Sequence, residues 1–351
     1  MAALGGNAND YNAGAMPAGI FEGCKETKGS TEVVKAPKPS THSWVAIDIV
    51  GGANFMNGIV AIDGHDMWVY SMDGAYIEPQ KVQALSVDNG GRYSVLVKVE
   101  RAGRFKIRCH SASAVQTLIG NAILKVPGAT AGDDESPRQW IDILGNPLSN
   151  DVSFFNQTVA YPFPPQPIAQ KADETHILNM RFINNTYTWA LNTTSLSPAT
   201  LEQEIPPALF DPAATIAKHD NVTIVTKYGT WIDLVLFASV LNMPAHPIHK
   251  HGVKMFVLGR GTGSFRWKSA EDAIKEVPES FNLVNPPRRD TVPSTPTAQN
   301  VGWVVVRYQV TNAGAWVCHC HIANHMMGGM VMVILDGTDA WPTIPAEYNL
   351  T

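Results

Sequence analysis

Apolar and polar residues alternate in many short segments along the chain, and turn residues separate these segments. Residues 42–50 show the pattern clearly and end at the pair Gly51-Gly52, and Asp63-Gly64 separates two further segments. This alternation predicts strands, because successive side chains of a strand point to opposite faces. The other predicted strands are residues 58–62, 67–70, 82–87, 92–99, 105–109, 117–126, 175–183, 223–226, 231–237, 253–258, 303–310 and 330–335.

These elements predict an all-β fold of Greek-key β-sandwich type, because strands are short, turn signals are frequent and long amphipathic helices are missing from the pattern. A short helical turn is expected at residues 271–276, and residues 1–40 are predicted to be irregular. The proline-rich run at 160–167 is a stiff linker. We therefore predict two domains, residues 1–165 and 166–351.

Composition narrows the function classes. A length of 351 residues suits two domains, and 45% hydrophobic residues suffice for two cores. The net charge is −5, and no basic block favours nucleic acid or a membrane surface as a partner. No apolar run is long enough to span a bilayer.

Two stretches near the C-terminus, residues 246–252 and 318–330, hold six of the eleven histidines and two of the four cysteines. A single histidine is usually a hydrogen-bonded core or surface residue. Imidazole and thiolate side chains at this density instead favour a soft or borderline metal.

Alternation along a strand divides these side chains between two faces. His319 and His321 would share one face and Cys320 would take the other. In the first stretch His249 and His251 would likewise share a face. The expectation is two metal sites, back to back and joined through the tripeptide 319–321.

His246 stands before Pro247 and can turn away from the other histidines of its stretch. Two histidines, a cysteine and a weakly bound methionine form the ligand set of blue-copper sites. Met330 can supply that methionine, although its neighbouring methionines suggest apolar packing. The two predicted groups are His246, Cys320 and His325 on one side, and His249, His251, His319 and His321 on the other.

The two stretches resemble the third and fourth copper-binding signatures of the multicopper oxidases, which include laccases, ascorbate oxidases and ferroxidases. The matches to H-P-x-H-x-H-G and H-C-H-I-x-x-H-x-x-x-G-M are complete. The resemblance implies copper as the cofactor, with His319, Cys320 and His321 as the catalytic electron path. It implies a type 1 copper bound by His246, Cys320, His325 and axial Met330, a type 2 copper bound by His249, and type 3 coppers bound by His251, His319 and His321.

In that family the type 1 copper takes single electrons from a reducing substrate, and the trinuclear cluster reduces dioxygen to water. The resemblance implies a phenolic substrate, with ferrous iron or ascorbate as alternatives. We expect the substrate to dock near His246 or His325, the imidazoles closest to solvent in the family. Asp290, Asp336 and Asp339 are predicted to be surface or loop charges, or in one case an acid that takes a substrate proton.

Residues 43–127 resemble the copper-free second cupredoxin domain of fungal, ascomycete-type laccases, and residues 173–351 resemble the third. The first domain of that family carries H-x-H-G and H-x-H, and outside the two stretches above no two histidines lie two positions apart. We therefore expect an N-terminal cupredoxin domain, in cis or from another chain, as a partner. His42, His65 and His110 are predicted to be ordinary surface or loop histidines.

The sequence carries some features of a secreted protein and lacks others. The chain lacks the basic start and apolar core of a signal peptide, so we expect a signal upstream of Met1. Cys24 and Cys109 could form a disulfide, whose connectivity stays open, and Cys318 is predicted to be a buried thiol. An extracellular or cell-wall location is favoured by glycosylation sequons at Asn156, Asn184, Asn192, Asn221 and Asn349.

The sequence is also compatible with two alternative functions. One is a non-catalytic blue-copper electron-transfer or copper-binding fragment. The other is a zinc enzyme with a three-histidine site formed by His246, His249 and His251. The position of Cys320 between two histidines argues against zinc.

Overall fold

The computed structural model describes most of the chain in two compact units, one ending at Pro165 and the other beginning at Gln166. Residues Cys24 and Asn349 lie outside the described part. The described residues are 31–53, 57–111, 119–128, 137–184, 187–203, 207–345 and 347.

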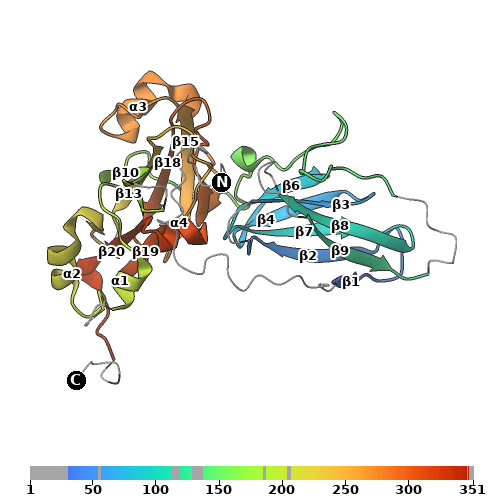
Figure 1. The fold of residues 1–351 in the computed structure, drawn as a ribbon, viewed down its shortest axis with the longest axis horizontal. Coiled ribbons are helices and arrows are strands. Elements are labelled where there is room, and N and C mark those ends of the chain that lie inside the picture. The colour runs from blue at the N-terminus through green and yellow to red at the C-terminus, as the bar shows by residue number, and fades with distance from the viewer. Residues whose placement is uncertain are drawn as a thin grey trace. The chain divides into compact units, whose positions relative to one another are not determined.

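The first unit contains a five-stranded and a four-stranded sheet with a large apolar core and a smaller cluster around Ile59 and Ile141 (Figure 1). The sheet orders are β1-β9-β8-β3-β6 and β2-β7-β4-β5. Side chains of β7 alternate between buried and half-buried, as the sequence pattern predicts. The strands are β1 (Val33–Lys35), β2 (Trp44–Val50), β3 (Gly58–Ile62), β4 (Met67–Met72), β5 (Ala75–Val82), β6 (Ala84–Val87), β7 (Arg92–Lys98), β8 (Gly103–Ser111) and β9 (Ile119–Val126); a 3-10 turn, η4 (Gln157–Val159), follows.

The second unit contains a six-stranded sheet, β11-β10-β13-β18-β15-β16, and a five-stranded sheet, β12-β20-β19-β14-β17. Its strands are β10 (Glu174–Phe182), β11 (Trp189–Ala190), β12 (Thr223–Val225), β13 (Trp231–Ala238), β14 (Pro247–Lys250), β15 (Met255–Thr262), β16 (Arg288–Arg289), β17 (Thr291–Pro293), β18 (Gly302–Gln309), β19 (Gly314–Cys320) and β20 (Val331–Asp336). Its helices are α1 (Pro198–Glu202), α2 (Pro212–His219), α3 (Ala270–Glu276) and α4 (Ala323–Met327), with 3-10 turns η5 (Asp220–Val222), η6 (Pro278–Ser280) and η7 (Thr338–Ala340).

The central strand β18 is buried along nearly its whole length. Trp303 and Val305 pack with Ala270 and Ala273 of α3. The hydroxyl of Tyr308 on the same strand donates to Asp336 of the other sheet. Because β18 is covered on both faces, its sequence reads as a continuous apolar run.

The sequence correctly predicts an all-β fold and the short helix at α3. It misses β5 because Pro79 interrupts that segment, and the structure places β5 at a sheet edge, where the missing N–H of proline is tolerated. The region predicted to be irregular also contains β1. Helices α1 and α2 begin at Pro198 and Pro212, directly after the capping residues Ser197 and Asp211, and the alternation pattern does not register these capping signals.

The prediction of surface or loop histidines is correct for the exposed His42 and for His65, which lies in the loop between β3 and β4, but wrong for His110, which lies in β8. His65 and His110 are buried, and their Nδ1 atoms contact the carbonyl oxygens of Asp63 and Asp142 at 2.9 and 2.7 Å. These backbone partners explain how polar rings are accommodated in the interior.

A buried ion pair joins β13 and β18. The guanidinium of Arg307 donates two hydrogen bonds to the carboxylate of Asp233, each 2.7 Å long, and both side chains are fully buried. Arg307 also donates to Glu271 of α3. The pair therefore links two central strands to the helix that covers them.

We expect Asp233→Ala to lower the free energy of unfolding by about 3–5 kcal/mol, because it leaves a buried guanidinium with less compensation. Chemical denaturation measures the change. Glu276→Ala, which removes the exposed partner of Arg266, is the matched control and should leave the midpoint unchanged. Equal midpoints for the wild type and Asp233→Ala would contradict the assignment.

Candidate metal centre

The two histidine-rich stretches lie side by side because β14 pairs antiparallel with β19. In this register His249 faces His319, and Ile248 faces Cys320. Helix α4 follows β19 directly and brings His325 back toward the strand. Residues more than 70 positions apart in sequence thus become neighbours.

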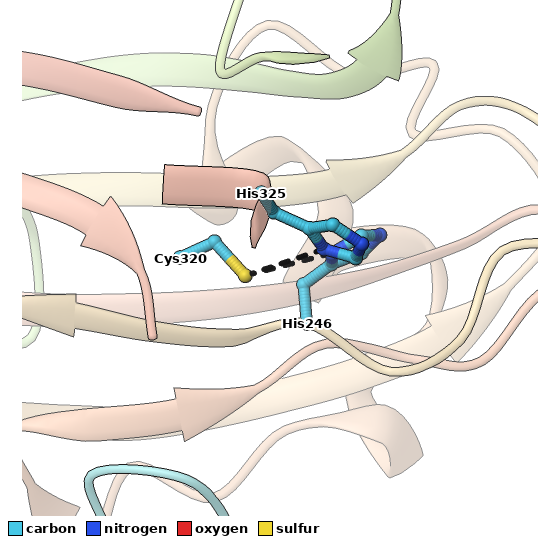
Figure 2. Close-up of side chains that lie close together, drawn as sticks. All are labelled: His246, Cys320 and His325. Atoms are coloured by element: carbon cyan, nitrogen blue, oxygen red, sulfur yellow. Dashed lines mark hydrogen bonds between the residues drawn. The ribbon is translucent and has the colours of Figure 1, made fainter. Parts of the chain in front are cut away.

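The first group consists of His246, Cys320 and His325, all fully buried. The Sγ atom of Cys320 lies 3.6 Å from Nδ1 of His246 and 3.7 Å from Nδ1 of His325. The two Nδ1 atoms are 3.0 Å apart. In Figure 2 both imidazoles lie at the sulfur, so three ligand-type atoms converge on one position.

The backbone fixes this group. The N–H of Cys320 donates to the carbonyl of Met330, and the N–H of Met330 donates to the carbonyl of His325. The N–H of His246 donates to the hydroxyl of Ser294. Met330 is fully buried and adjoins the group through these main-chain hydrogen bonds.

Trp189 covers the two imidazoles of the first group. Its ring centroid lies 4.1 Å from that of His325 and 5.2 Å from that of His246, and the tryptophan is itself buried. Both imidazoles are fully buried in the described structure, unlike the solvent-near rings that the resemblance implies, and substrate docking beside them stays a prediction. Sequence reasoning missed Trp189, which lies outside both signatures.

The second group consists of His249, His251 and His319, whose ligand atoms all lie within 4.8 Å of one another. The Nε2 atoms of His251 and His319 are 3.3 Å apart. His321 is nearby, with its ring centroid 5.8 Å from that of His249 and 5.6 Å from that of His319. This group is less covered than the first, since His251 is exposed and His249 half-buried.

Hydrogen bonds orient the rings of this second group. Nδ1 of His249 lies 3.0 Å from the carbonyl oxygen of Asp290 and 3.0 Å from the hydroxyl of Thr291. Nδ1 of His319 lies 2.9 Å from the carbonyl oxygen of Cys320. A carbonyl oxygen can only accept a hydrogen bond, so Nδ1 carries the proton in these contacts and Nε2 keeps its lone pair for a metal.

Burial sets the protonation of the ligand-type groups. It raises the pKa of the Cys320 thiol to about 12 and lowers the pKa of His246 to about 3. Burial, and then the neighbouring His246, hold the pKa of His325 well below its usual value. Burial is also the main reason why the pKa of His319 is lowered to about 4. At neutral pH the imidazoles of His246, His319 and His325 are thus neutral and ready to bind a cation.

The predicted acids occupy other roles. Asp336 is fully buried and pairs with Lys250, so its prediction as a surface or loop charge is wrong. Asp290 lies beside His249, with its carboxylate 3.5 Å from Nδ1. Asp339 accepts a hydrogen bond from the backbone N–H of Tyr228.

The structure also separates the ligands of the zinc alternative. His246 belongs to the first group, whereas His249 and His251 belong to the second. A single three-histidine site formed by these residues is therefore wrong.

The cysteines have separate environments. Cys318 is a fully buried thiol, as the sequence predicts, and burial raises its pKa to about 12. Cys109 forms no disulfide with another described cysteine. The proposed pairing with Cys24 lies outside the described residues.

Comparisons with known proteins agree with this geometry. Sequence profiles of the multicopper oxidase family match residues 18–129 and 194–340. The chain belongs to the multicopper oxidase family.

Among curated relatives of this multicopper oxidase, "Multicopper oxidase GIP1" of Gibberella zeae is 35% identical over 95% of the chain, which covers 49% of the relative. "Laccase 1" of Metarhizium majus is also 35% identical over 95% of the chain and is covered to 57%. The chain thus spans about half the length of the curated relatives it matches. The crystal structure of the laccase from Botrytis aclada has a similar fold, with a TM-score of 0.69 at 22% identity over 89% of this chain and 55% of that one.

Copper is the cofactor of this family, and the first group fits it. Copper binds thiolate and imidazole together, and metal bonds of about 2.0 Å to nitrogen and about 2.3 Å to sulfur can bridge atoms 3.0–3.7 Å apart. The second group offers imidazoles alone, with ring nitrogens within 4.8 Å of one another. The donor sets of both groups therefore suit copper.

We expect copper binding at Cys320 to release about one proton at pH 7, because the thiol is protonated before binding and the imidazoles are already neutral. Apparent affinity should then rise about tenfold per pH unit between pH 6 and 8. Chelator competition at several pH values measures the slope.

Two variants accompany this titration. Cys320→Ser should abolish the intense blue absorption, whereas Cys318→Ala, which removes the other buried thiol of β19, should retain it. A pH-independent affinity, or a blue band in Cys320→Ser, would exclude Cys320 as the thiolate ligand.

Proposed function

We propose that this chain carries the type 1 copper site and part of the trinuclear copper cluster of a laccase-like oxidase. One observation carries the proposal: Sγ of Cys320 and Nδ1 of His246 and His325 converge at 3.0–3.7 Å, while the histidines adjoining Cys320 face a second group. Bound copper would supply one-electron transfer from a phenolic substrate at the first site and reduction of dioxygen to water at the second. In this proposal His249 binds type 2 copper, and His251, His319 and His321 bind type 3 coppers.

The protein residues would hold and insulate this electron path. Cys320 is linked to His319 and His321 by single peptide bonds, so the two groups share the shortest covalent route that a strand offers. Burial of the first group keeps water from the sulfur. The carbonyl of Asp290 and the hydroxyl of Thr291 hold His249 with Nε2 available.

We further propose that an additional cupredoxin domain, in cis or from another chain, completes the second group. Exposure of His251 supports this, because a histidine shared with another domain must remain accessible before assembly. The greater length of the relatives also supports it. The copper-free domain would correspond to residues 1–165, and the copper-carrying domain to residues 166–351.

An extracellular or cell-wall location is part of the proposal. The sequon asparagines Asn156 and Asn221 are exposed, as glycan attachment requires. None of the helices in the described ranges combines the length and hydropathy that a bilayer crossing demands.

We expect the copper-loaded chain alone to accept one electron from a phenol at the blue site without sustained oxygen uptake, because the second group and the nearby His321 together supply four histidines for three coppers. Anaerobic reduction followed by oxygen-electrode measurement tests this. Addition of an N-terminal cupredoxin domain from a relative should restore uptake. Sustained uptake by the isolated chain would contradict the need for that domain, whereas a colourless copper complex would contradict the type 1 site.

We expect Met330→Leu to raise the reduction potential of the blue site, because a thioether ligand stabilises the oxidised ion and leucine removes it. Redox titration of the blue band measures the potential. Met332→Leu, which alters a buried methionine two residues away, is the matched control. Equal potentials for the wild type and Met330→Leu would rule out Met330 as axial ligand.

A further inference from the structure

The first histidine-rich stretch, residues 246–252, contains a buried charged residue between two of its histidines. Lys250 follows His249 and precedes His251, and its side chain is completely buried. In the register of the sheet it faces Cys318 rather than His319. It therefore points to the side of the sheet opposite the second histidine group.

This lysine is held by polar partners from several strands. Its Nζ donates to the carboxylate of Asp336 at 2.7 Å and lies 4.3 Å from the ring centroid of Tyr308. Asp336 also accepts from the hydroxyls of Tyr308 at 3.0 Å and Thr226 at 2.9 Å. The network joins β14 and β20 of one sheet to β18 of the other.

The same ammonium group reaches the histidine segment directly. Nζ of Lys250 donates to the carbonyl oxygen of His251 at 3.1 Å. β14 ends at Lys250, so the main chain of His251 lies beyond the last residue of that strand. In addition, the backbone N–H of His251 donates a hydrogen bond to the carbonyl of Val317. The ion pair between Lys250 and Asp336 thus fixes the main chain where it leaves the sheet. The position of that main chain determines where the imidazole of His251 lies.

Stability alone is a weak explanation for such a pair. Replacement of a buried ion pair by apolar residues of similar volume is often neutral or stabilising. Leucine or methionine at position 250 would fill the core equally well, but neither could donate to the carbonyl of His251. The feature that needs a lysine is therefore the hydrogen bond at the histidine segment.

We propose that Lys250 and Asp336 are positioning residues that hold His249 and His251 in the arrangement that binds copper in the second group. The inference rests on the proposed function, because it assigns the second group to copper. Lys250 acts through the main chain of its neighbours and does not touch the metal. Tyr308 and Thr226 orient the carboxylate of Asp336.

Loss of charge and loss of positioning predict opposite changes in copper affinity for the substitution Lys250→Met. Lys250→Met removes a positive charge near a cation site, so electrostatics alone predicts tighter copper binding. Loss of positioning predicts weaker binding by about ten- to a hundredfold, the usual effect of removing a group that orients metal ligands. The double variant Lys250→Met/Asp336→Leu removes both charges and leaves geometry as the only difference.

The experiment titrates Cu²⁺ into metal-free protein against a chelator, with two readouts. The blue absorption reports the Cys320 site, and electron paramagnetic resonance reports a second copper bound by imidazoles. We expect Lys250→Met and the double variant to weaken the second copper at least tenfold and to keep the blue band. Lys275→Met, which removes an exposed lysine of α3 that pairs with Asp272, should bind both ions as the wild type does.

The outcomes separate this inference from the proposed function. A double variant that binds the second copper with wild-type affinity would overturn the positioning role, as would a wild type that binds only the blue copper. Loss of the blue band in the wild type would instead contradict the proposed function. If Lys250→Met does not fold, Tyr308→Phe and Thr226→Val carry the test, since each removes one hydroxyl that orients Asp336. Weaker second-site binding in both supports the proposal, and unchanged binding in both contradicts it.

Discussion

Side chains of a β-strand alternate between its two faces, and the whole metal centre depends on this property of β19. Cys320 turns toward His246 and His325, while His319 turns toward His249 and His251. A strand is stiff, so the two groups cannot drift relative to one another. A strand that slipped by one residue would exchange the faces and destroy both groups at once.

The sandwich around β19 keeps that register fixed. Antiparallel pairing with β14 on one side and β20 on the other specifies each residue opposite Cys318 and His319. The buried pair of Lys250 and Asp336 adds a polar tie across the same three strands. Unlike apolar packing, hydrogen bonds of this kind fix both distance and direction.

Burial gives the two groups different characters. The first group is closed, with Trp189 packed over its imidazoles, and its thiol is protonated at neutral pH without a metal. The second group includes the exposed His251. In the proposed function, the closed site would suit electron transfer with little rearrangement, and the accessible site would suit ligands shared with another domain and a small molecule such as dioxygen.

The sequence by itself determined the all-β class, most strand positions and the division of the histidines between two faces, because period-two alternation is a local property. It could not place β5, since Pro79 hides an edge strand, nor find that Trp189 seals the first group. The sequence also did not predict the burial of Asp336 beside Lys250. Alternation along the strand places Lys250 on the face opposite His249 and His251, which is the core-facing side. Only tertiary structure decides such contacts, because they join residues that are distant along the chain and brought together by the packing of two sheets.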